Sequence, residues 1–137
     1  MAFKMQISKT LLMPANDSIV VLLEQPNMDY IDSSKEAACN VVGLVSRSTM
    51  RTQAIYRLRK GEIANCAYPI KTAAKKCLLI GTAFLDPEET IPSRGRLLML
   101  DADSMELVQE FTVEGSLQSI LVSDRNKFLI LGVNNQI

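Results

Sequence analysis

The sequence has no histidine and only three cysteines among its 137 residues. Histidine is the commonest general acid–base group and a frequent metal ligand, so its absence removes the usual basis of hydrolytic and zinc-dependent sites. Cys39, Cys66 and Cys77 are odd in number and form no CxxC pair, which indicates buried thiols rather than a disulfide framework or a zinc site. We therefore expect no enzyme activity, no metal and no cofactor.

An excess of charge of one sign and long apolar runs are also missing. Fifteen basic and fifteen acidic side chains cancel, so no overall field would attract nucleic acid or an acidic membrane surface. No apolar run approaches the roughly 20 residues of a membrane-spanning helix, and the first residues lack the apolar core of a secretory signal. We expect a single intracellular domain with no membrane contact and no small-molecule substrate.

Motifs of nucleotide binding and catalysis are absent as well. Gly81, Gly95 and Gly115 are not in GxxxxGK or GxGxxG spacing, so we expect them to serve turns and close backbone approach. Glu88 and Glu89 could be read as catalytic carboxylates, but adjacent residues on a loop point apart and no base or nucleophile accompanies them. A loop that is solvated, or that faces a protein partner, is the interpretation that remains.

The chain is rich in short runs of Val, Ile and Leu that are separated by polar turns, with little 3.6-residue periodicity. This pattern predicts an all-β fold. Three hairpins recur, at Ile7–Leu23, Ile63–Gly81 and Leu117–Gly132. Two further pairs of strands are expected between them, at residues 40–46 with 53–58 and 96–101 with 107–113. Residues 24–39 predict a long loop, in which a short helix at 33–38 is compatible with the sequence.

Four strands per repeat are typical of a β-propeller blade. The sequence thus predicts an incomplete β-propeller, with one blade at about residues 7–58, a second at about 63–113 and the start of a third at about 117–137. Closure takes about four to eight blades, so we expect a fragment, a truncated product or a chain that borrows blades in trans. The segment Glu106–Glu114 alternates polar and apolar residues and predicts an outer, partly exposed strand.

The second part of the chain, from about Gly61, carries a distinctive series of motifs. They are Gly81-Thr82-Ala83-Phe84, Asp86-Pro87-Glu88-Glu89, Pro92, Gly95-Arg96-Leu97-Leu98, Glu114-Gly115-Ser116-Leu117-Gln118-Ser119 and Lys127-Phe128-Leu129-Ile130. With them the chain resembles part of the third propeller of the family of damage-specific DNA-binding protein 1, the cleavage and polyadenylation factor large subunit and the propeller subunit of splicing factor 3b. The acidic proline loop is most similar to the DNA-damage branch.

The resemblance implies a function in protein assembly. In the DNA-damage branch the protein is a nuclear and cytoplasmic adaptor of a cullin-type ubiquitin ligase in DNA repair, and a cleft between two propellers holds interchangeable substrate receptors. The resemblance thus implies a non-enzymatic scaffold whose partners are such receptors. Carried over by motif, the partner-facing residues would be Glu89, Thr90, Ile91, Ser116, Gln118 and Ser119. The family loop has a second acidic residue at the place of Ile91 and an aromatic residue at the place of Gln118, so the chain departs from the family at two of these positions.

The alternative is an RNA-processing subunit of the polyadenylation or splicing branch, which would bind nucleic acid or protein. The candidate surface is a basic cluster formed by Arg47, Arg51, Arg57, Arg59 and Lys60. Few aromatic residues interleave with it for base stacking. A solvated strand edge that deters aggregation is therefore favoured, and any nucleic-acid contact is expected to be indirect.

Overall fold

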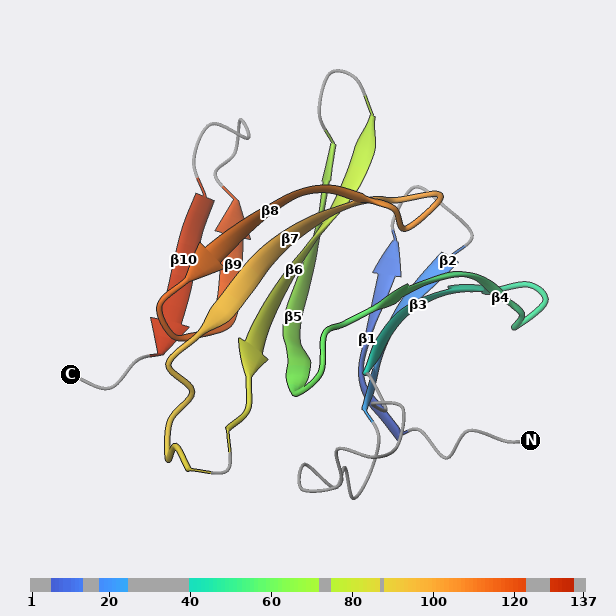
Figure 1. Cartoon of the computed structure of the whole chain (residues 1–137). Coiled ribbons are helices and arrows are strands. Elements are labelled where there is room, and N and C mark those ends of the chain that lie inside the picture. The colour runs from blue at the N-terminus through green and yellow to red at the C-terminus, as the bar shows by residue number, and fades with distance from the viewer. Residues whose placement is uncertain are drawn as a thin grey trace.

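The computed structural model describes residues 6–13, 18–24, 40–71, 75–86, 88–122 and 129–134. The described residues form β-strands and no helix, and the strands form three antiparallel sheets (Figure 1). The prediction of an all-β fold is confirmed. The segment 25–39, where the long loop and the short helix were expected, lies outside the described residues.

The ten strands follow one another as simple meanders, since every strand pairs with a neighbour in sequence. The first sheet contains β1 (Gln6–Met13), β2 (Ser18–Glu24), β3 (Val41–Ser46) and β4 (Thr52–Arg57). The second contains β5 (Glu62–Lys71), β6 (Lys76–Phe84), β7 (Gly95–Asp101) and β8 (Leu107–Val113). The third contains β9 (Ser116–Val122) and β10 (Leu129–Asn134). The predicted strands are thus confirmed to within a few residues at each end.

The β3–β4 and β7–β8 turns are built alike. The backbone N–H of Met50 donates to the carbonyl oxygen of Ser46 at 2.8 Å, and that of Met105 donates to Asp101 in the same way at 2.9 Å. Both methionines have a positive φ, 56° and 62° respectively, which is uncommon for a residue other than glycine. The first two sheets therefore repeat one another in the conformation of a turn as well as in strand order.

The second sheet is the centre of the molecule, and its face toward the first sheet carries the larger apolar core. Successive side chains of a strand point to opposite faces, so Leu78 and Ile80 of β6 lie on the same side as Leu98 of β7. The buried residues of this interface are Val20, Leu22, Val42, Leu44, Leu58, Ala64, Leu78, Ile80, Leu98, Leu100, Ala102 and Met105.

The opposite face of the second sheet packs on the third sheet. Leu79 of β6 and Leu97 of β7 point this way and meet Leu117 and Ile120 of β9, and half-buried side chains surround these four. β9 contacts β5, β6 and β7. Strands β6 and β7 are consequently buried along most of their length, as expected for strands covered on both faces.

The two edge strands of the second sheet, β5 and β8, differ in exposure. β5, the first strand of the second sheet, contacts β1 and β9, the first strands of the other two sheets. β8, the last strand of the second sheet, pairs with β7 alone and is exposed from Leu107 to Thr112. The prediction of an outer, partly exposed strand at 106–114 is confirmed, and the strand is exposed over most of its length.

Candidate docking site

An acidic loop connects β6 to β7 and projects from one end of the central sheet (Figure 1). Asp86, Glu88 and Glu89 in this loop are exposed. A short turn orders its first part, because the N–H of Glu88 donates to Oδ1 of Asp86 and the N–H of Glu89 donates to the Asp86 carbonyl oxygen, both at 2.9 Å. The turn presents three carboxylates to solvent in one short segment.

Both ends of the loop are fixed by backbone hydrogen bonds. The N–H of Leu85 donates to the carbonyl oxygen of Gly61 at 2.7 Å, and the N–H of Phe84 donates to that of Arg94 at 2.9 Å. The Arg94 guanidinium carbon lies 5.4 Å from the centre of the Phe84 ring, within the range of a cation–π contact. Gly61 has a φ of 76°, a conformation that favours glycine. The loop therefore starts and ends on an ordered base.

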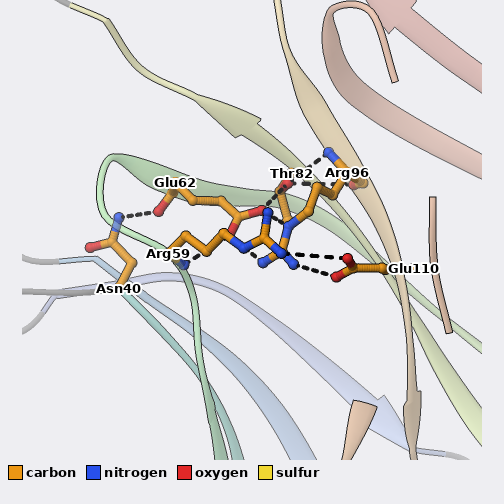
Figure 2. A network of polar contacts seen from close by, with 6 residues as sticks. All are labelled: Asn40, Arg59, Glu62, Thr82, Arg96 and Glu110. Atoms are coloured by element: carbon orange, nitrogen blue, oxygen red, sulfur yellow. Dashed lines mark hydrogen bonds and ion pairs between the residues drawn. The ribbon is translucent and has the colours of Figure 1, made fainter. Parts of the chain in front are cut away.

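A buried ion pair lies beneath this base. Figure 2 shows the carboxylate of Glu62, at the start of β5, facing the guanidinium of Arg96, at the start of β7. Arg96 donates from Nη2 to Oε1 at 2.5 Å and from Nε to Oε2 at 2.7 Å, and their side chains are 3% and 0% exposed. The Thr82 hydroxyl donates to Oε2 at 2.6 Å and accepts the backbone N–H of Arg96 at 3.0 Å. Such bidentate, charge-assisted bonding fixes β5, β6 and β7 together at the loop end.

The network continues outward to solvent and sideways to the first sheet. Arg96 Nη1 donates to Oε2 of Glu110 on β8 at 2.7 Å, and Nη2 of the exposed Arg59 lies 3.4 Å from Oε1 of the same carboxylate. Nδ2 of Asn40 donates to the backbone oxygen of Glu62 at 2.9 Å, and the N–H of Arg59 donates to Oε1 of Glu62 at 2.9 Å. Every strand of the central sheet thus contributes to the network, as does the connection from the first sheet.

The environment of Arg96 favours its charged form. Burial lowers the pKa of the guanidinium, but the hydrogen bond and the charge of Glu62 outweigh burial, so the pKa is raised above the ordinary value of arginine. Within the described residues, no buried side-chain nitrogen or oxygen lacks a hydrogen-bond partner. The ion pair is therefore fully satisfied, which a buried charge requires if it is not to destabilise the fold.

The base of the loop lies directly against the turn between β8 and β9. A Cβ at Gly95 would meet the backbone oxygens of Thr82 and Gly115, so only glycine allows this approach. The β6–β7 loop and the start of β9, which hold the residues that the resemblance implied to be partner-facing, are therefore brought to the same end of the molecule. This juxtaposition follows from β7 pairing with β8, in which Gly95 lies opposite Val113.

The six predicted partner-facing residues differ in accessibility. Glu89, Thr90, Gln118 and Ser119 are exposed, and Ile91 is half-buried. Ser116 is buried, and its hydroxyl oxygen accepts hydrogen bonds from Nδ2 of Asn65 at 3.0 Å and from Nε2 of Gln118. The Ser116 side chain thus forms contacts within the molecule, while Gln118 and Ser119 on β9 are accessible to solvent.

The basic cluster is exposed but divided. Arg47 and Arg51 flank the turn before β4, whereas Arg57, Arg59 and Lys60 lie at the other end of that strand. At about 3.3 Å per residue, the six residues of β4 separate the two groups by roughly 20 Å. One member, Arg59, is already paired with Glu110. The cluster is therefore two short groups along a sheet edge rather than one patch.

Sequence reasoning did not identify Glu62, Glu110 or Asn40 as important residues. A usable signal was present, because Glu62 and Arg96 are charged residues at or next to the start of strands that are mainly apolar. Thr82 and Arg96 also belong to the motifs Gly-Thr-Ala and Gly-Arg. The structure gives these motif residues a role in the buried network below the loop.

The described residues contain no group of three or more Cys, Asp or Glu side chains that could hold a metal ion. Cys77 is buried, as predicted, and burial raises the pKa of its thiol. Cys66 is half-buried, with Sγ 3.7 Å from the carbonyl oxygen of Leu117, and Cys39 lies outside the described residues. Among the described residues there is no helix long and apolar enough to cross a membrane.

No protein-family model matches the chain, and none of the curated proteins matches it either.

Proposed function

We propose that this chain is a non-enzymatic β-propeller scaffold that docks protein partners through the β6–β7 loop, with Glu89 as its main contact. The observation that carries the proposal is the exposed acidic turn on a base that is held by a buried ion pair. A rigid base lowers the entropy that a loop loses on binding. Exposed carboxylates would select a partner with basic groups and speed their encounter.

The arrangement of the sheets supports the propeller part of the proposal. Meander sheets that stack face to face, with the first strand of each sheet in contact with the first strand of the next, are what the blades of a propeller present around its axis. The two similar turns, at Met50 and Met105, are in keeping with repeated blades. On this proposal residues 7–58 and 63–113 are blades, and 117–137 begins a third.

The resemblance to the DNA-damage branch supplies the class of partner. We infer that the partner is a substrate receptor of a cullin-type ubiquitin ligase, and that the chain acts in the nucleus in the response to DNA damage. Glu89 and Thr90 would contact the receptor from the loop, and Gln118 and Ser119 from β9. All four are exposed at or near the end of the molecule where the loop base meets Gly115.

A pull-down with purified substrate receptors tests this function. The double variant Glu89→Arg, Gln118→Arg reverses one charge and adds another on the proposed surface, and we expect it to lose at least about 90% of the captured receptor, a tenfold weakening. The matched control is Glu106→Arg, Gln109→Arg, which makes the same two changes at exposed positions on or next to β8. Equal capture by wild type and the first variant would refute the proposal.

The RNA-processing alternative receives less support, because β4 separates the two groups of basic residues. It makes a distinct prediction, namely salt-dependent RNA binding that weakens when Arg47 and Arg51 are replaced by alanine. Filter binding at two salt concentrations measures this. Binding of that kind, together with no capture of receptors, would replace the first proposal by the second.

A further inference from the structure

The regular pairing of β6 with β7 is interrupted just before the loop that joins them. Their paired register ends at Gly81, which lies opposite Leu97. β6 continues to pair with β5 as far as Phe84, and β7 pairs with β8 from Gly95 onward. Farther out, the N–H of Phe84 donates to the carbonyl oxygen of Arg94 at 2.9 Å. The residues between these two points must therefore be held together in another way.

The side chain of Thr82 provides this link, as Figure 2 shows. Its hydroxyl oxygen accepts the backbone N–H of Arg96 at 3.0 Å, so a side chain of β6 binds a main-chain group of β7. The hydroxyl donates its own hydrogen to Oε2 of Glu62 on β5 at 2.6 Å. Because Thr82 is 0% exposed, water does not compete for either bond. One hydroxyl thus connects three strands.

The backbones of β6 and β7 also approach one another closely beside this hydroxyl. A Cβ at Gly95 would meet the carbonyl oxygen of Thr82, so a residue with a side chain would force the two strands apart. The loop therefore leaves the sheet at a place where Thr82 on one strand and Gly95 on the other determine how far apart the strands lie.

We propose that Thr82 is a positioning residue for the β6–β7 loop, and that its hydroxyl sets the geometry with which the loop leaves the sheet. Without the hydroxyl, the N–H of Arg96 loses this partner, and β7 loses its link through Thr82 to the carboxylate of Glu62. Glu89 would then be presented in more than one position, and fixing it in one of them on binding would cost more conformational entropy. For this effect on binding, the proposal rests on the docking function proposed above.

The variants Thr82→Val and Thr82→Ser test the proposal, because valine keeps the branched shape without the hydroxyl and serine keeps the hydroxyl. A glutamyl endopeptidase, which cleaves after glutamate, reports on the loop, since a segment must open locally before a protease can cleave it. We expect Thr82→Val to speed cleavage after Glu88 and Glu89 by about fivefold, the factor that one ordinary hydrogen bond contributes. Thr82→Ser should be cleaved at the wild-type rate.

Two controls distinguish positioning from a general loss of stability. Leu98→Ala creates a cavity in the same sheet without removing the hydroxyl. Thr112→Val makes the same chemical change on β8, where Thr112 is exposed. Neither control should speed cleavage in the loop, and amide hydrogen exchange in the middle of β5 and β6 should remain slow in Thr82→Val.

Pull-down with substrate receptors measures the effect on binding in the same variants. Thr82→Val should weaken the capture of receptor, and Thr82→Ser should retain it. A wild type that captures no receptor would refute the docking function, whereas the cleavage rates would still decide whether Thr82 positions the loop. Cleavage of Thr82→Val at the wild-type rate would overturn the proposal, and so would equal acceleration by Thr82→Ser or by Leu98→Ala.

Discussion

The central sheet packs on other strands with both of its faces, but the apolar clusters on the two faces differ in the number and burial of their residues. Toward the first sheet, twelve buried apolar residues of the described chain form one cluster, and the buried pair Glu62–Arg96 closes it at the loop end. Toward β9 and β10 the cluster has four buried residues and is completed by half-buried ones. The first face thus holds more fully buried apolar residues than the second, although β9 lies close to β5, β6 and β7.

The difference indicates which part of the molecule opens first. Local unfolding takes place where few buried apolar contacts hold an element to the rest. The β9–β10 hairpin fits that description, whereas β2 to β7 contribute to the large cluster, β8 contributes to the ion network and β1 pairs with β2. We therefore expect the first eight strands to unfold as one unit, and the last hairpin to detach at a lower free energy.

The largest effect is expected from Glu62→Ala. The substitution leaves the guanidinium of Arg96 buried without its carboxylate, and breaking a buried pair in this way destabilises proteins by about 3–5 kcal/mol. Urea denaturation followed by circular dichroism measures the loss. As a control, Glu110→Ala removes a carboxylate that is 40% exposed and should cost clearly less. If Glu62→Ala lowers the free energy of unfolding by less than about 1 kcal/mol, the buried ion pair does not stabilise the packing of the central sheet on the first sheet.

An intermediate effect, different on the two faces, is expected from Leu98→Ala and Leu117→Ala. Both leucines are 0% exposed, and each substitution removes a similar volume. Leu98→Ala should lower the free energy of global unfolding by about 2–5 kcal/mol. Leu117→Ala should mainly increase amide hydrogen exchange in β9 and β10 and leave β6 and β7 protected. Mass spectrometry of exchanged peptides distinguishes the two, and a uniform loss of protection in Leu117→Ala would show that the faces open together.

The smallest effect is expected from Arg59→Ala. Arg59 forms a 3.4 Å ion pair with Glu110 in which the side chains are 60% and 40% exposed, and pairs of this kind contribute at most about 1 kcal/mol. Its contribution should disappear in high salt, since salt screens exposed charges. Lys75→Ala is the matched control, because Lys75 forms a similar 3.6 Å pair with Asp101 outside the network. If Arg59→Ala lowers the stability as much as Glu62→Ala does, the exposed pair Arg59–Glu110 contributes as much as the buried pair Glu62–Arg96.

Most of the strands could be predicted from the sequence because they are runs of apolar residues bounded by polar turns. The segment 107–113 was recognised as an outer strand since polar and apolar residues alternate along it, and β8 is exposed as expected. Likewise, the continuous apolar runs in β6 and β7 are typical of strands that are covered on both faces, as these two are. These features depend only on residues close together in the chain.

The ion network could not be predicted in this way. Glu62 and Arg96 are 34 positions apart, and they meet only because β6 places β5 and β7 on its two sides in one particular register. The burial of Ser116 has a similar origin, since Asn65 on β5 of the second sheet donates a hydrogen bond to the Ser116 hydroxyl on β9 of the third sheet. Sequence reasoning identified the exposed residues of the loop, but not the contacts between strands that hold the loop in place.

The buried network also provides a signature by which related chains can be found. Thr82 follows Glu62 by 20 positions, Arg96 follows Thr82 by 14, and Glu110 follows Arg96 by 14. Since the loss of any one partner of a buried pair is costly, substitutions at these positions should occur together rather than singly. Where overall similarity is too low to detect, a chain with these four residue types at this spacing on four successive strands would be recognisable as a relative by this pattern of charges.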